Sequence, residues 1–394
     1  MSRSATTRAR ERIADLAGAG HDLVTFWTEA AEALAPAVPC HLTACFYTLD
    51  PASRLVTSHY QDGLPEIPAE WLAEEYLGDD FNKIADVARS PRGISTLHEA
   101  TGGEPERSHR YRTAMREYGA EQEVVVALRT RPGDAWGCLG LYREVGGRTF
   151  DDEELGLLRD VSAHLAEGAR RALLIGEAAD PEGPDAPGLV VLREDWSVES
   201  LTPGVERWLA ELPDGDWEAS NRLPPAVVAV AGQARRTADG AAPGEVAVAR
   251  VLTASGRWVV LHGASLVSAG ATRTAVIVEP AHPARIAPLL MAAYGLTERE
   301  QEVTRLVLQG ESTTAIAEGM SVSPHTVQQH LKGVFEKTGV RSRRDLTGKV
   351  FFAHYEPRLR DNERRAATGR PLRGGPVSPE GLPPAPGPPP APPG

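Results

Sequence analysis

The chain has 394 residues, of which 41% are hydrophobic, with a formal net charge of −12 and three cysteines. This length predicts two or three domains with hydrophobic cores, and an odd, sparse set of cysteines argues against a disulfide framework. No apolar run approaches the roughly 18 residues that cross a bilayer, and the N-terminus lacks the apolar core of a signal peptide. We therefore expect a cytoplasmic protein without a membrane partner.

The first 175 residues predict an α+β unit that ends in a long helix. Residues 1–39 have helical spacing, and residues 149–175 predict an amphipathic helix with acids in its first turn, as the helix dipole favours. Shorter helical segments are expected near 71–77 and 107–118. Four strand candidates form two hairpins, 41–49 with 54–60 and 123–130 with 136–143.

This order of helix, strand pair, variable middle, strand pair and closing helix resembles a GAF domain. The phrase WGCLGLYRE, followed by TFDDEELGLLRDVSAHLA, is similar to the end of that fold. The resemblance implies a GAF-like sensory domain at 21–175. An N-terminal helical or flexible segment at 1–20 would precede it.

A second, smaller α+β unit is predicted at 189–280, after an acidic Pro/Gly linker at 176–188. It begins with a hairpin and short helices. A helix at 225–235 follows, and then three strands at 246–253, 257–264 and 274–279. This length and order resemble a PAS domain, and residues 281–291 are expected to form a helical connector to the next unit.

Residues 296–350 carry the start and stop signals of four short helices. Thr297 with Glu300 is a capping box, and Ser323 followed by Pro324 is a capping hydroxyl before a proline at the first helical position. The remaining signals are a stop at Gly310, a cap at Ser312, and a second capping box of Ser342 and Asp345.

The helix that starts after Ser323 separates an apolar stripe from a polar face. The stripe follows helical spacing through Val327, Leu331, Val334 and Phe335. The opposite face carries His325, Gln328, Gln329 and Lys332. Two short helices joined by a tight turn, the second with a polar outer face, predict a helix-turn-helix.

The pattern LTxRExEV, then IAxxMxVSxHTVxxHLxxVFxKxGVxSR, resembles the LuxR/FixJ-type helix-turn-helix domain of bacterial transcription regulators over residues 292–353. The resemblance implies an all-α, tetrahelical DNA-binding domain at 292–356 whose third helix enters the major groove. By motif position, the base-reading candidates are Gln328, Gln329, His330 and Lys332, and Gln328 stands where the family commonly has a basic residue. The candidates for backbone contacts are Thr313, Thr314, Ser323, Thr326, Lys337, Arg341 and Arg343, and those for dimer contacts in the fourth helix are Leu346 and Val350.

The charge is distributed unevenly along the chain. Residues 324–352 contain six basic and two acidic residues, a local charge of +4 that suits a DNA phosphate backbone despite the acidic total. Residues 357–394 contain twelve prolines and almost no large apolar groups. They cannot bury enough surface to offset chain entropy, so a disordered Pro-rich tail is predicted.

Phosphotransfer, metal binding and catalysis fit the residues less well. Asp151 and Asp152 open a helix, as the helix dipole favours, and the N-terminal part lacks the alternating parallel strands of a receiver domain. Cys40, His41 and Cys45 lack a fourth ligand, and in a strand the two cysteines would point to opposite faces. No P-loop, dinucleotide-binding, zinc-protease or nucleophile-elbow motif is present, so an enzyme is not predicted.

The sequence thus predicts a multidomain α+β protein, with GAF-like and PAS-like antiparallel-sheet sensory domains, an all-α helix-turn-helix and a disordered tail. The predicted function is sequence-specific regulation of bacterial transcription by a homodimer on double-stranded DNA, with RNA polymerase as a further candidate partner. The alternative is a ligand-sensing or protein-interaction module with weak or vestigial DNA binding. No cofactor is predicted. An unknown small-molecule ligand in either sensory domain is left open, with His59, His98 and His109 as residues to consider.

Overall fold

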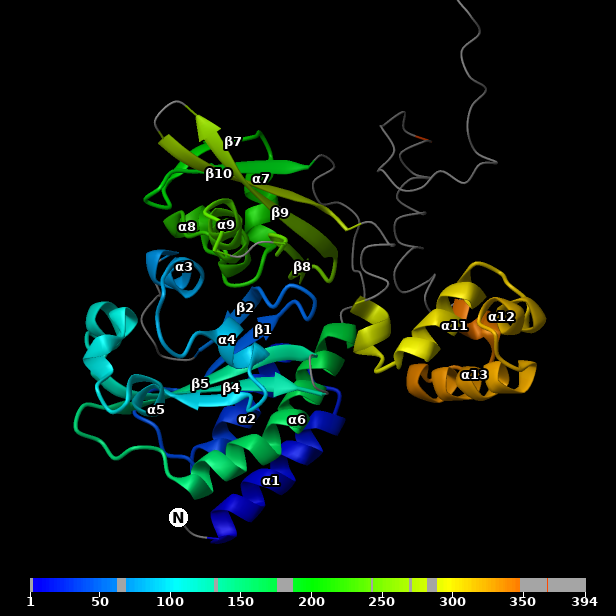
Figure 1. Ribbon diagram of the computed structural model, residues 1–394, viewed down its shortest axis with the longest axis horizontal. Coiled ribbons are helices and arrows are strands. Elements are labelled where there is room, and N and C mark those ends of the chain that lie inside the picture. Colours follow the sequence, from blue (N-terminus) through cyan, green and yellow to red (C-terminus); the bar gives the residue numbers. More distant parts are fainter. Residues whose placement is uncertain are drawn as a thin grey trace, which may run out of the picture.

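The computed structural model describes residues 3–61, 69–130, 134–175, 187–241, 244–268, 271–281, 289–347 and Ala367. Two α+β units, each with a five-stranded antiparallel sheet, precede a small helical unit (Figure 1). This confirms the predicted α+β class and the helical C-terminal unit. Most of the predicted linker, Val350 and, apart from Ala367, the predicted tail lie outside the described residues.

The sheet of the first unit has the strand order β2-β1-β5-β4-β3. Its strands are β1 (Cys45–Leu49), β2 (Val56–Tyr60), β3 (Ile94–Thr96), β4 (Ala120–Arg129) and β5 (Ala135–Glu144). One face is covered by the helices α1 (Arg3–Gly18), α2 (Leu23–Leu34) and α6 (Asp152–Ile175) (Figure 1). Ile13 of α1 is fully buried in this core, where Trp27 stacks on Phe46 with ring centroids 4.4 Å apart. The N-terminal helix, expected as a separate segment, therefore contributes to the first unit's core.

The middle of the first unit contains the helix predicted near 71–77 and further elements that periodicity does not predict. The helices there are α3 (Ala69–Leu77), α4 (Ile84–Arg89) and α5 (Leu97–Thr101). The helix expected at 107–118 is instead a 3₁₀ turn at Pro105–Arg107 followed by a π-helical turn at Tyr111–Met115. The Asp80 carboxylate accepts hydrogen bonds from the amides of His109 and Arg110, at 3.2 and 2.7 Å, and so fixes the start of this irregular segment.

The sheet of the second unit has the order β7-β6-β10-β9-β8. Its strands are β6 (Gly188–Leu192), β7 (Val198–Leu201), β8 (Val248–Leu252), β9 (Trp258–Ser268) and β10 (Ala271–Pro280), and its helices are α7 (Val205–Glu211), α8 (Trp217–Ser220) and α9 (Pro225–Ala238). The β9–β10 hairpin is longer than predicted, because pairing continues as far as Ser268 opposite Ala271.

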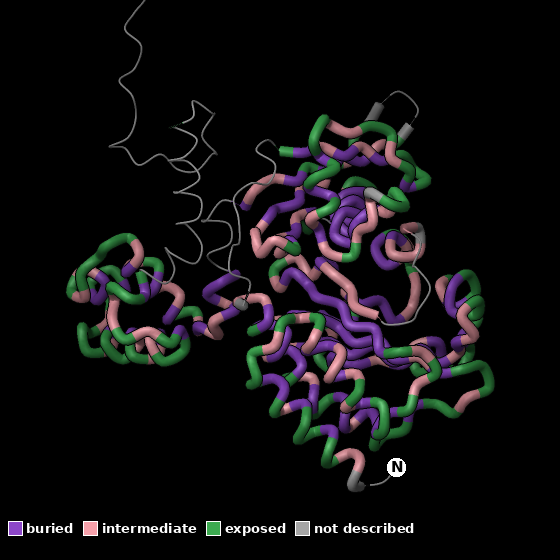
Figure 2. The backbone as a smooth tube through the Cα atoms, turned by 180° about the vertical axis from the view of Figure 1, so that it is seen from behind, coloured by how far each residue is buried: buried purple, intermediate pink, exposed green. Residues whose placement is uncertain are grey.

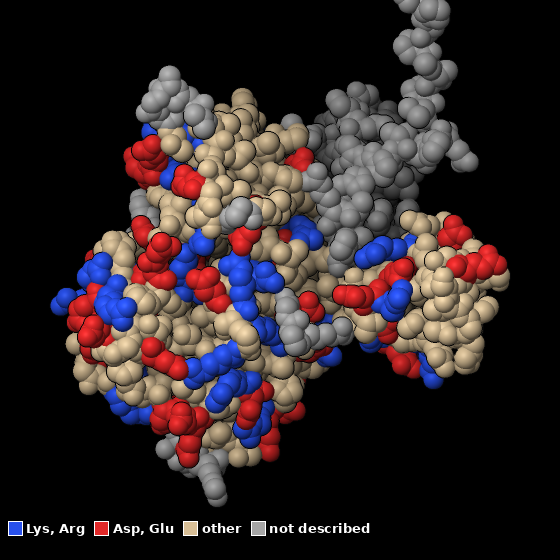
Figure 3. All heavy atoms as spheres, viewed as in Figure 1, with Lys and Arg blue, Asp and Glu red and all other residues tan. Residues whose placement is uncertain are grey.

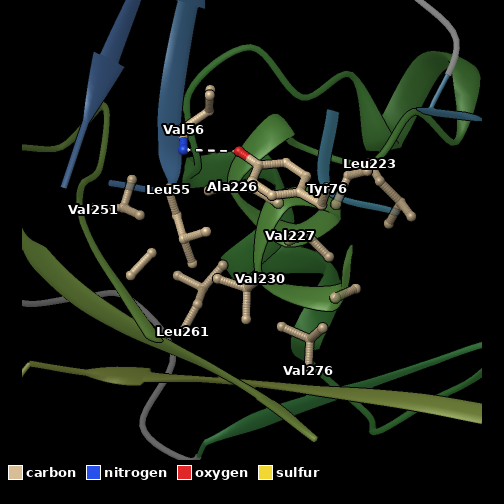
Figure 4. Close-up of a cluster of buried hydrophobic side chains, with 14 of the residues drawn as sticks. Leu55, Val56, Tyr76, Leu223, Ala226, Val227, Val230, Val251, Leu261 and Val276 are labelled. Atoms are coloured by element: carbon tan, nitrogen blue, oxygen red, sulfur yellow. Dashed lines mark hydrogen bonds between the residues drawn. The ribbon is translucent and has the colours of Figure 1, made fainter. Parts of the chain in front are cut away.

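The two α+β units share one hydrophobic core. Residues 225–235 of α9 are all buried, because α9 lies between its own sheet and the first unit (Figures 1 and 2). Tyr76 of α3 packs beside α9, and its hydroxyl accepts a 3.1 Å hydrogen bond from the Val56 amide (Figure 4). A Cβ at Gly232 would lie 2.9 Å from the Cβ of Tyr76, so this approach of α3 to α9 requires glycine.

An ion pair also links the units. Asp50, whose side chain is 0% exposed, follows β1, and Arg250 lies on the edge strand β8. The Asp50 carboxylate accepts hydrogen bonds from the backbone nitrogen, Nε and Nη2 of Arg250 at 2.8, 2.8 and 2.7 Å. Three donors on one buried carboxylate satisfy a charge that would otherwise be costly to bury.

The connector to the C-terminal unit is docked on both α+β units. Residues 289–293 are helical, and Leu289 and Leu290 pack in clusters that include Trp136 of β5 and Trp258 of β9. Arg170 of α6 donates hydrogen bonds to the carbonyls of Ala292 and Ala293, at the carboxyl end of the connector helix. A cation there is favourable for the helix dipole.

The C-terminal unit is built from α11 (Glu298–Leu308), α12 (Thr313–Gly319) and α13 (Pro324–Thr338), with a further helical segment at 343–347. Its core contains one or more apolar residues from each of these four segments, among them Val303, Ile316, Val327, Leu331 and Leu346. Most other residues of the unit are exposed or half-buried (Figure 2).

Candidate nucleic-acid interface

The predicted helix starts of the C-terminal unit are confirmed. Thr297 and Glu300 form a reciprocal capping box, and the Ser312 hydroxyl accepts from the amide of Ala315 at 3.1 Å. Ser323 caps α13 ahead of Pro324. These local signals set where each helix begins, and therefore which face of α13 is turned outward.

The two faces of α13 differ as the sequence predicts. Val327, Leu331 and Val334 are buried in the unit's core. His325, Gln328, Gln329 and Lys332 are exposed on the opposite face, and His330 is half-buried. The amide nitrogen of Gln329 lies 3.2 Å from Nε2 of His325, one turn away. The result is an outer face of amides, imidazole and ammonium, the groups that hydrogen-bond to base edges.

A charged brace that sequence reasoning missed fixes α13 against α11. Nζ of Lys337 donates a 2.6 Å hydrogen bond to Oε2 of Glu300. A Cβ at Gly333 would lie 2.5 Å from Oε1 of Glu300, so glycine makes room for the carboxylate. Burial raises the pKa of Glu300, but the hydrogen bonds from Lys337 and from Thr297 outweigh it, and the pKa lies below the ordinary glutamate value. The only advance signal of this brace is a glycine in the interior of an amphipathic helix.

Most of the candidates for DNA-backbone contacts are engaged within the protein. Lys337 belongs to the brace. Nη1 of Arg343 donates to the Thr313 hydroxyl at 3.1 Å, and its Nη2 donates to the Glu311 carbonyl. The Ser323 hydroxyl accepts from the Thr326 amide at 3.1 Å. The two further candidates, Thr314 and Arg341, are exposed.

The predicted dimer contacts have different positions in the structure. Leu346 is 1% exposed and packs into the core of its own unit. That burial corrects the expectation that its side chain contacts a second copy, because the residue already completes the core. Val350 lies outside the described residues.

Charge in the C-terminal unit is segregated along the chain. Residues 289–347 contain seven basic and seven acidic residues, and five of the acids precede α13 whereas five of the bases lie in or after it. Both signs occur on the face of the unit seen in Figure 3. The positive charge is therefore a property of α13 and the segment after it, and not of the unit as a whole.

The other sequence candidates are placed as follows. Within the described residues no group of three or more His, Cys, Asp or Glu side chains could hold a metal, and no helix is long and apolar enough to span a membrane.

Burial raises the pKa of Cys40 to about 11 and that of Cys45 to about 12. Of the three histidines considered for a ligand, His59 lines a cavity, whose lining includes neither His98 nor His109.

Comparison with known proteins identifies the C-terminal unit. Residues 295–350 match the GerE family model, described as "Bacterial regulatory proteins, luxR family". A putative HTH-type transcriptional regulator of Mycobacterium bovis is 49% identical over 55 residues, which are 14% of this chain and 6% of that protein. The spore germination protein GerE of Bacillus subtilis is 40% identical over 48 residues, 12% of this chain and 65% of that protein. These matches cover the C-terminal unit alone.

Similar solved structures span more of the chain at lower likeness. A Vibrio cholera VqmA–ligand–DNA complex is 16% identical, covers 44% of this chain and 87% of that chain, and has a TM-score of 0.21. A bacteriophytochrome from R. palustris is 14% identical to this chain and has a TM-score of 0.28. The match covers 71% of this chain and 63% of that chain. Scores this low do not establish a shared arrangement. The identification of the C-terminal unit therefore rests on the family match, by which residues 295–350 are similar to the luxR family of bacterial regulatory proteins.

Proposed function

We propose that the chain is a cytoplasmic transcription regulator that binds double-stranded DNA sequence-specifically as a homodimer, with α13 in the major groove. The observation that carries the proposal is the exposed polar face of α13, held by the buried stripe and by the Glu300–Lys337 brace. A braced helix presents Gln328, Gln329 and Lys332 at fixed spacing, which base reading requires.

The chemistry of this face favours base contacts over bulk attraction. Glutamine can pair bidentately with adenine, and lysine can reach guanine acceptors or phosphate. The unit as a whole carries no net charge, so nonspecific attraction to phosphate is weak. A single helix-turn-helix of this kind needs a second copy for useful affinity, on half-sites about one helical turn apart. RNA polymerase is then the partner through which bound protein would change transcription.

The α+β units are proposed as GAF-like and PAS-like sensory domains that control how α13 is presented. Support comes from the connector, which packs on both units before entering the DNA-binding unit. Arg170 holds its last carbonyls, so a shift of α6 would move the attachment point of the DNA-binding unit.

Selection of binding sites from random DNA with the full-length protein tests the proposal. Enrichment of an inverted repeat, lost when Gln328 and Gln329 are both changed to Ala, is the expected result. The second candidate is a ligand-sensing or protein-interaction module, which the balanced charge of the C-terminal unit favours. That reading predicts no enriched sequence, and such a result would overturn the DNA-binding proposal.

A further inference from the structure

A cavity of about 140 Å³ lies where the two α+β units meet. Most of its lining comes from the first unit, including Leu42 and Met115. The second unit completes the lining with Asp214, Arg222 and Leu223, and with Pro225 and Val228 of α9. Apolar cavities of about 150 Å³ take up a benzene molecule. The space therefore fits one ring with a small substituent.

The aromatic part of the lining is uncharged. Tyr47 of β1 and Tyr142 of β5 both line the cavity, and burial raises the pKa of each far above the ordinary tyrosine value. Tyr47 also stacks on the His59 ring, with centroids 5.6 Å apart. Flat aromatic walls favour a flat guest, because ring-to-ring packing adds to the gain from burying apolar surface.

The lining contains two acidic side chains, Glu75 and Asp214, and two basic side chains, Arg110 and Arg222. Arg110 donates two 2.8 Å hydrogen bonds to the Glu123 carboxylate, whose side chain is 0% exposed. Burial, opposed by the charge of Arg110, raises the pKa of Glu75 to about 7. Because acidic and basic side chains are equal in number, the lining offers no net charge to offset the cost of desolvating an ionised guest. A neutral guest is therefore favoured.

The His59 ring belongs to the lining of the cavity. Nε2 of His59 is buried and has no hydrogen-bond partner within the part of the chain that the structure describes. The same residue is fixed through its backbone, since its amide donates a 2.7 Å hydrogen bond to Asp214 of the second unit. Because leaving a buried polar atom unpaired is unfavourable, a hydrogen-bonding group on the guest would gain by meeting it.

We propose that this junction cavity binds a neutral, ring-sized molecule carrying one hydrogen-bonding group, which is held between both α+β units and pairs with Nε2 of His59. The proposal deepens the sensory role assigned above and rests on it for biological meaning. Its test contains no DNA, so its failure is distinguishable from failure of the DNA-binding proposal.

Phenol and toluene are matched probes, because they share size and shape. They differ only in the substituent on the ring, which is a hydroxyl in phenol and a methyl group in toluene. Calorimetric titration of the full-length protein should show saturable binding of both, with phenol tighter. His59→Phe keeps a ring in place and removes Nε2, so phenol should lose about tenfold in affinity and toluene should bind as before. Absence of saturable binding of either probe would overturn the site, and an unchanged preference for phenol in His59→Phe would overturn the role of His59.

A second pair of variants tests whether the second unit forms part of the site. Val228→Ala removes two methyl groups from the cavity wall. This change should lower the affinity for toluene at least threefold. Val227→Ala, its neighbour on α9, is equally buried and does not line the cavity, so it should leave affinity unchanged. Circular dichroism of both variants establishes that they fold. Equal toluene affinity in the two variants would show that the ligand does not bridge the units.

Discussion

Lys337 near the end of α13 and Glu300 in the first turn of α11 form a 2.6 Å ion pair across the helix-turn-helix. The two residues are far apart in sequence. The Glu300 carboxylate also makes a second interaction. Its Oε2 also accepts a 2.7 Å hydrogen bond from the Thr297 amide, which closes the capping box of α11. One carboxylate therefore both caps the start of α11 and fixes α13 against it.

Glu300→Gln should loosen both helices. The local free energy of unfolding of the two helices should fall by about 1 kcal/mol. This figure allows for solvent screening at Lys337, whose side chain is 35% exposed. Amide hydrogen exchange in α11 and α13 measures it, because exchange reports local stability within a larger chain. The matched control is Lys332→Met. Lys332 pairs with Glu336 only at 3.9 Å on an exposed surface, and equal acceleration in both variants would contradict a special role for Glu300.

The same carboxylate predicts a pH dependence. Because the folded pKa of Glu300 lies below its unfolded value, the pair stabilises the unit fully above the ordinary glutamate pKa of about 4.3. That contribution is lost as the pH falls through the folded pKa. The difference in exchange rate between wild type and Glu300→Gln should therefore shrink on acidification below about pH 4. A difference that is constant from pH 7 to pH 3 would be inconsistent with the ion pair.

Gly333→Ala should destabilise α13, although alanine normally stabilises a helix interior by about 0.5–1 kcal/mol over glycine. The new Cβ would lie 2.5 Å from Oε1 of Glu300 and push the carboxylate away from Lys337 and Thr297. Gly319→Ala at the end of α12 is the control, since no atom lies within 4 Å of the Cβ position there. Hydrogen exchange should accelerate in the first variant and not in the second.

Asp50→Asn should weaken the joint between the α+β units. The change leaves Arg250 without its anionic partner, although the Arg250 side chain is only 15% exposed. Because an unpaired buried charge is costly, the free energy of unfolding should fall by about 3 kcal/mol. Urea unfolding followed by tryptophan fluorescence measures it. Asp160→Asn removes the partner of Arg10 on an exposed surface and should cost less than about 1 kcal/mol. Similar midpoints for the two variants would mean that the buried pair adds little.

Lys332→Ala should weaken binding to a site recovered by selection, since Lys332 is exposed on the reading face and is held only by a loose pair with Glu336. A phosphate contact predicts a uniform loss across sequences and a salt slope smaller by about one. A base contact predicts a loss confined to the preferred site. Arg299→Ala on α11 is the control, and anisotropy titration at fixed salt that shows no change for Lys332→Ala would remove it from the interface.

The helix-turn-helix was predictable because its signals are local. Ser323 before Pro324 starts α13, and the spacing of Val327, Leu331 and Val334 orients it. Pairing between distant residues was not predictable in the same way. Lys337 was expected on phosphate by motif position, and nothing in sequence spacing shows that it meets Glu300 instead.

The shared core of the α+β units was also missed, although α9 carries a usable signal. Its sequence PAVVAVAGQAR is apolar on all sides, which is typical of a helix buried on all sides. Tyr76, which covers α9 from the first unit, gives no such hint in its own segment. The two units were predicted as separate domains because each prediction used only the residues within its own range.

The docking of the connector has a consequence for how far the DNA-binding unit can travel. Only Tyr294 to Thr297 separate the carbonyls held by Arg170 from the first turn of α11. Gly295 in this short stretch has a φ of +69°, and a Cβ there would lie 2.8 Å from Nη1 of Arg170. The C-terminal unit is therefore joined to α6 by a short, docked connection and not by a long linker. In a dimer, the spacing between two such connections, and hence the permitted gap between half-sites, would be set by where the two copies of α6 end.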